Sequence, residues 1–245
     1  MFRTIFITDG SEVAFYAAVF RAWKCPSAHI DSAKNFQPLI TDEIKTVSQT
    51  EEETEEQARR VKSALLQIDA RAVSEIRHIL ASGNIQKEQI AYLYLKEIFR
   101  YRAPARDKTY LGCVRAATDV LHAIGKEIEH LKGFIRFRET AAGVYYAACA
   151  PDNDILPQLA RHFIGRLACP FILHDISRAY ALCYNGASVA KIEAAEADVP
   201  LSASEEEFAA LWASYYRNVA IRAHTNPKLQ DRLMPRRYRK FMPET

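Results

Sequence analysis

The sequence predicts an α+β protein in which an antiparallel sheet carries helices on one face beside a mostly helical block. Apolar residues recur at spacings of three and four over residues 48–131, which is the period of a helix face. Residues 134–149 and 171–193 alternate with the period of a strand, and Asn185-Gly186 is typical of a hairpin turn. One helix between these two β-rich stretches predicts the sheet with helices on one face.

Four segments are expected along the chain. Residues 1–47 should form a strand and a helix that pack with the C-terminal lobe, and residues 48–132 should form the helical block. Residues 133–200 should form the α+β sheet lobe. Residues 201–245 should form a last helix followed by a basic tail.

Local signals justify the individual elements. Residues 2–8 are β-branched and aromatic, as in a strand, and Ser11 can cap the helix that follows. Glutamates within residues 51–56 suit the positive end of the first helix of the helical block. Asp154 is expected to cap a helix in the sheet lobe, and the last helix should begin near Ser204. Its apolar stripe consists of Phe208, Leu211, Trp212, Tyr215 and Val219.

Composition excludes several classes of protein. Nearly half of the 245 residues are apolar, which is typical of a globular protein, and the formal net charge of +3 is too small to name a partner. The sequence has no run of about 18 apolar residues, so we expect no membrane association. The five cysteines stand far apart, which indicates neither a disulfide framework nor a compact metal site. We therefore expect a cytoplasmic protein without a cofactor or bound metal.

The strongest charge asymmetry lies in the C-terminal segment, residues 217–245, where eight basic residues face two acidic ones. Tyr238 and Phe241 are interleaved with these cations. Such a mixture can follow a phosphate backbone and offer a ring for base stacking. The alternative is a tail that the aromatic residues pin to the core, with its charges merely exposed.

A second group of polar residues gathers in the sheet lobe and leaves three uses open. Asp152 and Asp154 with His162 and His174 could bind a divalent metal for phosphodiester chemistry. His174 could instead be a general base that an aspartate such as Asp175 orients. In the third alternative the aspartates have a structural role: they cap a helix and a turn and form salt bridges with arginines.

The sequence resembles a bacterial family described as "probable DNA metabolism protein". The residues that carry the resemblance are GFIRFRE from Gly133, YYA from Tyr145, P-D-x-D-I-L-P-x-L-A-x-H-F-x-x-R from Pro151, I-L-H-D-x-x-R from Ile172, F-x-x-L-W-x-x-Y-x-R from Phe208, and N-P-x-L-Q-x-x-x-M-P-R-R-Y-x-K-x-M-P-E from Asn226. The resemblance spans nearly the whole chain and is tightest from Gly133 onward. Members of that family look like partners of a DNA-modification or repair protein of the radical S-adenosylmethionine class, and the same domain is found fused to uracil-DNA glycosylase domains.

The resemblance implies an accessory protein of DNA metabolism or repair that binds DNA and partners such an enzyme. The residues expected to bind nucleic acid are Arg136, Arg138, Arg166, Arg178, Arg232, Arg236, Arg237, Tyr238, Arg239 and Lys240. One alternative is an enzyme acting on DNA, a nuclease or a glycosylase-like protein, that uses the two histidines and the Asp152/Asp154 pair. Another is a protein-interaction module that binds no nucleic acid.

Overall fold

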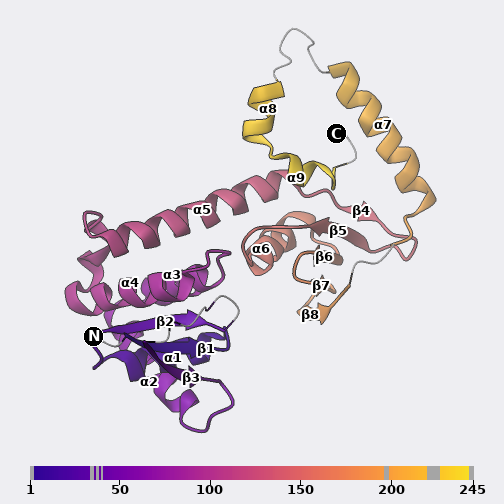
Figure 1. The fold of residues 1–245 in the computed structure, drawn as a ribbon. Helices are drawn as coiled ribbons and strands as arrows, with labels where there is room; N and C mark the ends of the chain where they lie inside the picture. Colours follow the sequence, from indigo (N-terminus) through magenta and orange to yellow (C-terminus); the bar gives the residue numbers. More distant parts are fainter. Residues whose placement is uncertain are drawn as a thin grey trace. The chain divides into compact units, whose positions relative to one another are not determined.

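The structure is a computed structural model that describes residues 3–33, 36, 39, 41–195, 199–219 and 227–242. The chain divides into two compact units, Met1–Ile124 and Gly125–Thr245, and the boundary falls within α5 (Gly112–Phe134). The secondary structure confirms the α+β class that the sequence predicts (Figure 1).

The first unit combines a small parallel sheet with helices. In chain order its elements are β1 (Arg3–Thr8), α1 (Glu12–Ala22), β2 (Ala28–Ser32), β3 (Asp42–Val47), α2 (Thr54–Ile68), α3 (Ala70–Leu80), α4 (Lys87–Tyr101), the 3-10 helix η1 (Ala103–Asp107) and the first part of α5. The strand order is β2-β1-β3, with both pairings parallel. The Ser11 side chain accepts a hydrogen bond from the Ala14 amide and caps α1, as predicted. Residue 2 lies outside the described residues.

The core of the first unit joins α1 to the helical block. Because α1 is apolar nearly all round, most of its length is buried, and it packs against α2. Phe15 and Tyr16 of α1 share this core with Leu65 of α2 and Leu95 of α4. The predicted helical block is confirmed, and residues 3–47 belong to the same unit as its first helices. The predicted packing of residues 1–47 with the C-terminal lobe stays a prediction.

The second unit is built on a five-stranded sheet. After the end of α5 its elements are β4 (Arg138–Glu139), β5 (Tyr145–Cys149), α6 (Leu156–Leu167), β6 (Phe171–Asp175), β7 (Tyr180–Tyr184), β8 (Val189–Glu193), α7 (Ala203–Val219), α8 (Pro227–Leu233) and α9 (Arg236–Arg239). The strands follow one another in the order β4-β5-β6-β7-β8. The predicted hairpin between β7 and β8 is confirmed, with Asn185 accepting two backbone hydrogen bonds in the turn.

The prediction of an antiparallel sheet is wrong for one strand pair of this sheet. β5 and β6 are parallel, whereas the other pairs in the second unit are antiparallel. The reason is that α6 connects β5 to β6 as a crossover, which returns the chain in the same direction. Asp154 does not cap α6 either. Ile155 occupies the N-cap position, and the Asp154 carboxylate accepts a hydrogen bond from the Tyr180 hydroxyl.

Helix α7 has an unexpected environment. It begins within one residue of the predicted start, and two glutamates occupy its first turn. Its apolar stripe is not covered by the second unit, since Phe208 and Leu211 are 63% and 69% exposed. Among the described helices none combines the length and the apolar composition that crossing a membrane requires.

Candidate nucleic-acid interface

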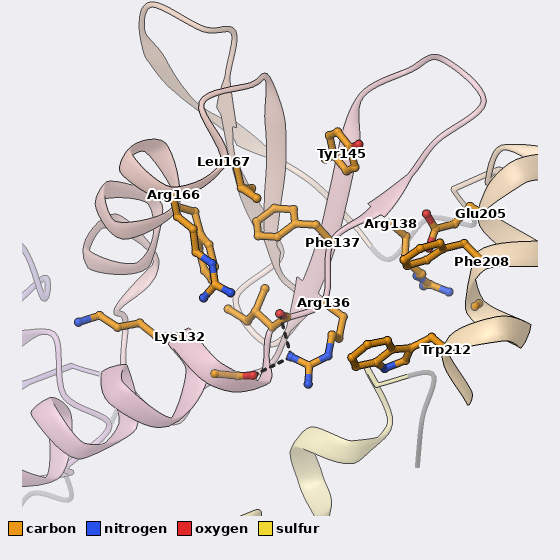
Figure 2. Close-up of a pocket in the computed structure, with 14 residues that line it drawn as sticks. Lys132, Arg136, Phe137, Arg138, Tyr145, Arg166, Leu167, Glu205, Phe208 and Trp212 are labelled. Atoms are coloured by element: carbon orange, nitrogen blue, oxygen red, sulfur yellow. Dashed lines mark hydrogen bonds between the residues drawn. The ribbon is translucent and has the colours of Figure 1, made fainter. Parts of the chain in front are cut away.

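An open cleft of about 520 Å³ lies in the second unit, bordered by the end of α5, β4, α6 and α7 (Figure 2). Its cations are Lys132, Arg136, Arg138 and Arg166, and its aromatic residues are Phe137, Tyr145, Phe163, Phe208 and Trp212. Glu205 also lines it. The volume is in the range of small-molecule and nucleotide sites. The lining therefore combines positive charge with ring faces in a single concave surface.

The sequence around β4 explains the basic side of the cleft. Phe137 packs into the core, with its ring centre 4.9 Å from that of Phe163. Arg136 and Arg138, which flank Phe137 in sequence, lie toward α7 (Figure 2). The Arg136 Nη1 donates to the Gly133 carbonyl oxygen at 2.6 Å, at the C-terminal end of α5. This bond suits the negative end of the helix dipole and fixes the side chain at the edge of the cleft.

The first turn of α7 is held against β4 by reciprocal hydrogen bonds. Ser202 Oγ accepts from the Glu205 amide at 3.2 Å, and the Ser202 amide donates to the Glu139 carbonyl oxygen at 3.0 Å. The Glu205 carboxylate in turn accepts from the Glu139 amide at 3.1 Å. These bonds resemble a capping box in which the glutamate reaches the neighbouring strand. They place the next turns of α7, with Phe208 and Trp212, along the cleft (Figure 2).

A smaller cavity of about 120 Å³ adjoins the same two arginines. Its lining consists of Arg136, Arg138, Ala148, Lys240, Phe241 and Met242. The Lys240 Nζ lies 4.7 Å from the centre of the Phe241 ring. Three cationic side chains around a small polar cavity suit an oxyanion such as a phosphate group. Because Arg136 and Arg138 line both cavities, the phosphate-sized site and the aromatic cleft meet at these residues.

Three arginines of the tail, residues 227–242, are bound to carboxylates instead. Asp231 accepts from Arg236 and from Arg239, each at 2.7 Å. The hydrogen bond from Arg236, followed by that from Arg239, lowers the pKa of Asp231 below its usual value. Arg237 pairs with Asp152 at 2.7 Å. Three arginines of the tail thus form ion pairs within the protein, as expected if the tail has a structural role.

Tyr238 and Glu127 anchor this tail to α5. The Tyr238 hydroxyl donates to Glu127 Oε1 at 2.8 Å, and burial together with this carboxylate raises the pKa of Tyr238. Glu127 also accepts from the amides of Asp152 and Asn153 and from the Asn153 side chain, at 2.6–3.1 Å. The predicted stacking role of Tyr238 is wrong for this structure, because its ring is only 2% exposed and packs beside Phe134.

His174 is a structural residue rather than an open base. It is 3% exposed, and its Nε2 lies 3.1 Å from the Ala194 carbonyl oxygen. Since a carbonyl oxygen only accepts, Nε2 carries the hydrogen, and Nδ1 accepts from the Tyr146 hydroxyl at 2.8 Å. Both ring nitrogens therefore already have hydrogen-bond partners within the protein.

The remaining catalytic candidates have separate partners. Asp175 is fully buried and binds Arg178 at 2.8 Å, and Arg178 also donates to the carbonyl oxygens of residues 151 and 152. His162 lies on α6 with its ring centre 5.0 Å from that of Phe163, and its buried Nε2 has no hydrogen-bond partner among the described residues. In the part of the chain that the structure describes, no group of three or more His, Cys, Asp or Glu side chains could hold a metal ion. The geometry gives no support to shared catalysis by the two histidines and the Asp152/Asp154 pair.

The predicted binding residues thus fall into two sets. Arg136, Arg138 and Lys240 meet at the small cavity, and Arg166 joins the first two in the cleft. The second set lies outside both cavities: Arg178, Arg236, Arg237 and Arg239 pair with carboxylates, Tyr238 is buried, and Arg232 is exposed on α8.

Sequence reasoning named none of the aromatic residues of the cleft as binding residues, and it also missed Lys132. These aromatic residues are Phe137, Tyr145, Phe163, Phe208 and Trp212. Their spacing marked them as residues of a helix or strand face, but no local signal said that this face would stay uncovered.

The fold and the cleft define an α+β protein with a cationic, aromatic-lined surface. The chain belongs to the family described as domain of unknown function DUF4130, whose match covers residues 85–244, about two thirds of the chain. No curated protein and no solved structure matches it. The matched region contains every residue of the cleft and of the small cavity.

Proposed function

We propose that this protein is an accessory factor of DNA metabolism or repair that binds nucleic acid through the cleft and the adjoining small cavity. One observation carries the proposal: Arg136 and Arg138 lie where an aromatic cleft and a phosphate-sized cationic cavity meet. Ring faces for bases next to cations for phosphates are what nucleic-acid sites combine. The sequence resemblance to probable DNA metabolism proteins agrees with nucleic-acid binding but does not identify a reaction.

The proposal assigns the contact to the cleft and the small cavity rather than to the arginines of the tail. Each tail arginine that binds a carboxylate would have to exchange that partner for a phosphate, which reduces its net contribution. Arg138 and Lys240 line a cavity and are the better candidates for phosphate contacts. The tail helps indirectly, because the Tyr238 anchor holds the segment that carries Lys240.

We also propose that the protein works together with a partner enzyme. The resemblance favours a radical S-adenosylmethionine or uracil-DNA glycosylase type enzyme on another polypeptide, for which this protein would hold the DNA. The helical block of the first unit is the surface that we propose for this enzyme. A cytoplasmic location is part of the same proposal.

A protein-interaction module without nucleic acid is the second candidate function. It is favoured by the ion-paired tail and by the exposed apolar side chains of α7. It does not explain why three cations surround the small cavity. The two functions differ in one measurable respect, which is whether the protein binds DNA.

Titration of fluorescently labelled single- and double-stranded oligonucleotides at rising salt tests the proposal. We expect binding at low salt whose logarithm falls linearly with the logarithm of salt concentration. The double variant Arg138→Ala/Lys240→Ala should bind more weakly and with a smaller slope, because two phosphate contacts are lost. Arg161→Ala is a matched control, since Arg161 is exposed on α6 and does not line either cavity. Absence of binding to both DNA forms at low salt would overturn the proposal.

A further inference from the structure

We infer that the cleft binds single-stranded nucleic acid, with bases stacked on the exposed aromatic face of α7 and a backbone phosphate in the small cavity. This inference rests on the proposed function and names the form of nucleic acid. It goes beyond general phosphate binding because it assigns separate places to bases and backbone. Three features of the second unit carry it.

The first feature is the aromatic face of α7. Phe208, Trp212 and Tyr215 are 63%, 37% and 57% exposed, and their spacing of four and three residues places them on one helix face. The rings of Trp212 and Tyr215 are stacked, with centres 5.7 Å apart and planes inclined by 30°. Soluble proteins seldom leave such apolar surface uncovered unless it binds something.

The second feature is the charge beside this face, which selects the occupant. Arg136, Arg138 and Lys132 line the cleft together with Phe208 and Trp212 (Figure 2). An apolar peptide would gain nothing from these cations, whereas a polynucleotide presents phosphates and flat bases together. The acidic group in the lining, Glu205, is occupied by the Glu139 amide. Charge complementarity therefore favours a polyanion with stacking faces.

The third feature is geometry, which distinguishes single strands from duplexes. In a duplex the faces of the bases are stacked on one another, so protein rings cannot reach them unless a base leaves the helix. A cleft of about 520 Å³ has room for exposed bases. The small cavity, which shares Arg136 and Arg138 with the cleft, supplies the neighbouring place for a phosphate. A flexible single strand can occupy both, because its bases are free to turn toward α7.

Tryptophan fluorescence of the full chain tests this inference. The chain has two tryptophans, and Trp23→Phe leaves Trp212 as the reporter while keeping an aromatic ring beside Phe99. We expect oligothymidylate of about 15 residues, long enough for a typical single-strand site, to quench Trp212 to saturation. A duplex of the same length should cause little quenching. Trp212→Ala should weaken single-strand binding by about 10-fold, as the loss of one stacked base predicts, and leave duplex binding unchanged.

Leu211→Ala is the matched control on the same helix, since Leu211 is exposed but has no ring. It should leave single-strand affinity unchanged. Equal binding of single strands and duplexes without quenching would overturn the inference and leave the proposed function intact. An equal loss for Leu211→Ala and Trp212→Ala would show general apolar contact, as with a protein partner, and would also overturn it. Failure of both DNA forms to bind would instead reject the proposed function.

Discussion

The tail and the cleft are both rich in cations, but the structure uses these cations differently. In the tail, Arg236 and Arg239 share Asp231, and Arg237 binds Asp152. In the cleft, Arg136 caps a helix end while Arg138 lies beside aromatic rings (Figure 2). A basic sequence segment therefore does not by itself provide a binding surface. The position of each guanidinium group in the fold, in an ion pair of the tail or in the lining of a cavity, matters as well.

The contrast has a physical basis in the position of the acidic residues. Asp231 is five residues before Arg236, so a short turn brings them together within the tail itself. The loop after β5 supplies Asp152 to Arg237, and Glu127 fixes that loop through its amides. Among the described residues that line the small cavity none is acidic. The tail is therefore a structural clamp, and the cavities are the cationic surfaces that we propose for binding.

The largest effect that we expect is on the stability of the clamp. Glu127→Ala should lower the free energy of unfolding of the second unit by about 3 kcal/mol, because it removes a buried carboxylate and leaves several donors without a partner. Urea denaturation followed by Trp212 fluorescence measures the change. Glu129→Ala, which removes a mostly exposed carboxylate two residues away on α5, should change stability by less than about 0.5 kcal/mol. Similar losses for the two variants would contradict the clamp.

Tyr238→Phe should lower the free energy of unfolding by a smaller amount. This variant separates the contribution of the hydroxyl group from that of the ring. It keeps the packing against Phe134 but removes the hydrogen bond to the Glu127 carboxylate. Bonds to charged acceptors contribute about 1.5–3 kcal/mol, so we expect a loss of about 2 kcal/mol in the same denaturation experiment. An unchanged midpoint would mean that the tail is not anchored through this bond.

An arginine variant in the cleft and an arginine variant in the tail should differ in their affinity for single-stranded DNA. Arg138→Ala should weaken single-stranded DNA binding by about 10-fold at low salt and reduce the salt slope by about 0.7, as for one lost phosphate contact. Arg236→Ala, which removes the same charge from the tail, should change affinity by less than about 2-fold. Fluorescence anisotropy titrations at several salt concentrations measure both quantities. The reverse ranking would return the binding function to the tail.

The smallest expected effect is a pH dependence of the tail. Because Arg236 and Arg239 lower the pKa of Asp231, their pairing stabilises the folded tail fully above the unfolded value of about 3.9. That contribution should disappear as the pH falls through the still lower pKa of the folded state. Carboxyl-detected NMR titration should show the Asp231 pKa below its ordinary value in the wild type and closer to that value in Arg236→Ala. An ordinary pKa in the wild type would contradict the pairing.

Local patterns predicted most of the fold. Helix periodicity located the helical block and α7, and Asn185-Gly186 located the last hairpin. The direction of β6 was missed, because strand alternation looks the same in parallel and antiparallel pairs and only the crossover through α6 decides it. The capping role of Asp154 failed for a similar reason: Tyr180, far along the chain, competes for the same carboxylate.

The site was predictable only in part. Residue type and spacing found Arg136, Arg138, Arg166 and Lys240, since cations near a strand and at a chain end stand out. The same reasoning also predicted that Arg237 and Tyr238 bind nucleic acid. In the structure Arg237 pairs with Asp152, and Tyr238 donates to Glu127. Pairing across more than about 80 positions leaves no local signal in a sequence. The exposure of the apolar face of α7 could not be predicted from the sequence either, because it depends on which other elements pack against this helix.

Photocrosslinking tests most directly whether the cleft, rather than the tail, holds nucleic acid. A single-stranded oligonucleotide that carries 5-bromodeoxyuridine would be irradiated with the full chain, and the attached peptides would be mapped by mass spectrometry. We predict crosslinks to Trp212, Phe208 or Tyr145 of the cleft. Crosslinks confined to residues 227–239 of the tail, with the cleft peptides unmodified, would contradict this account.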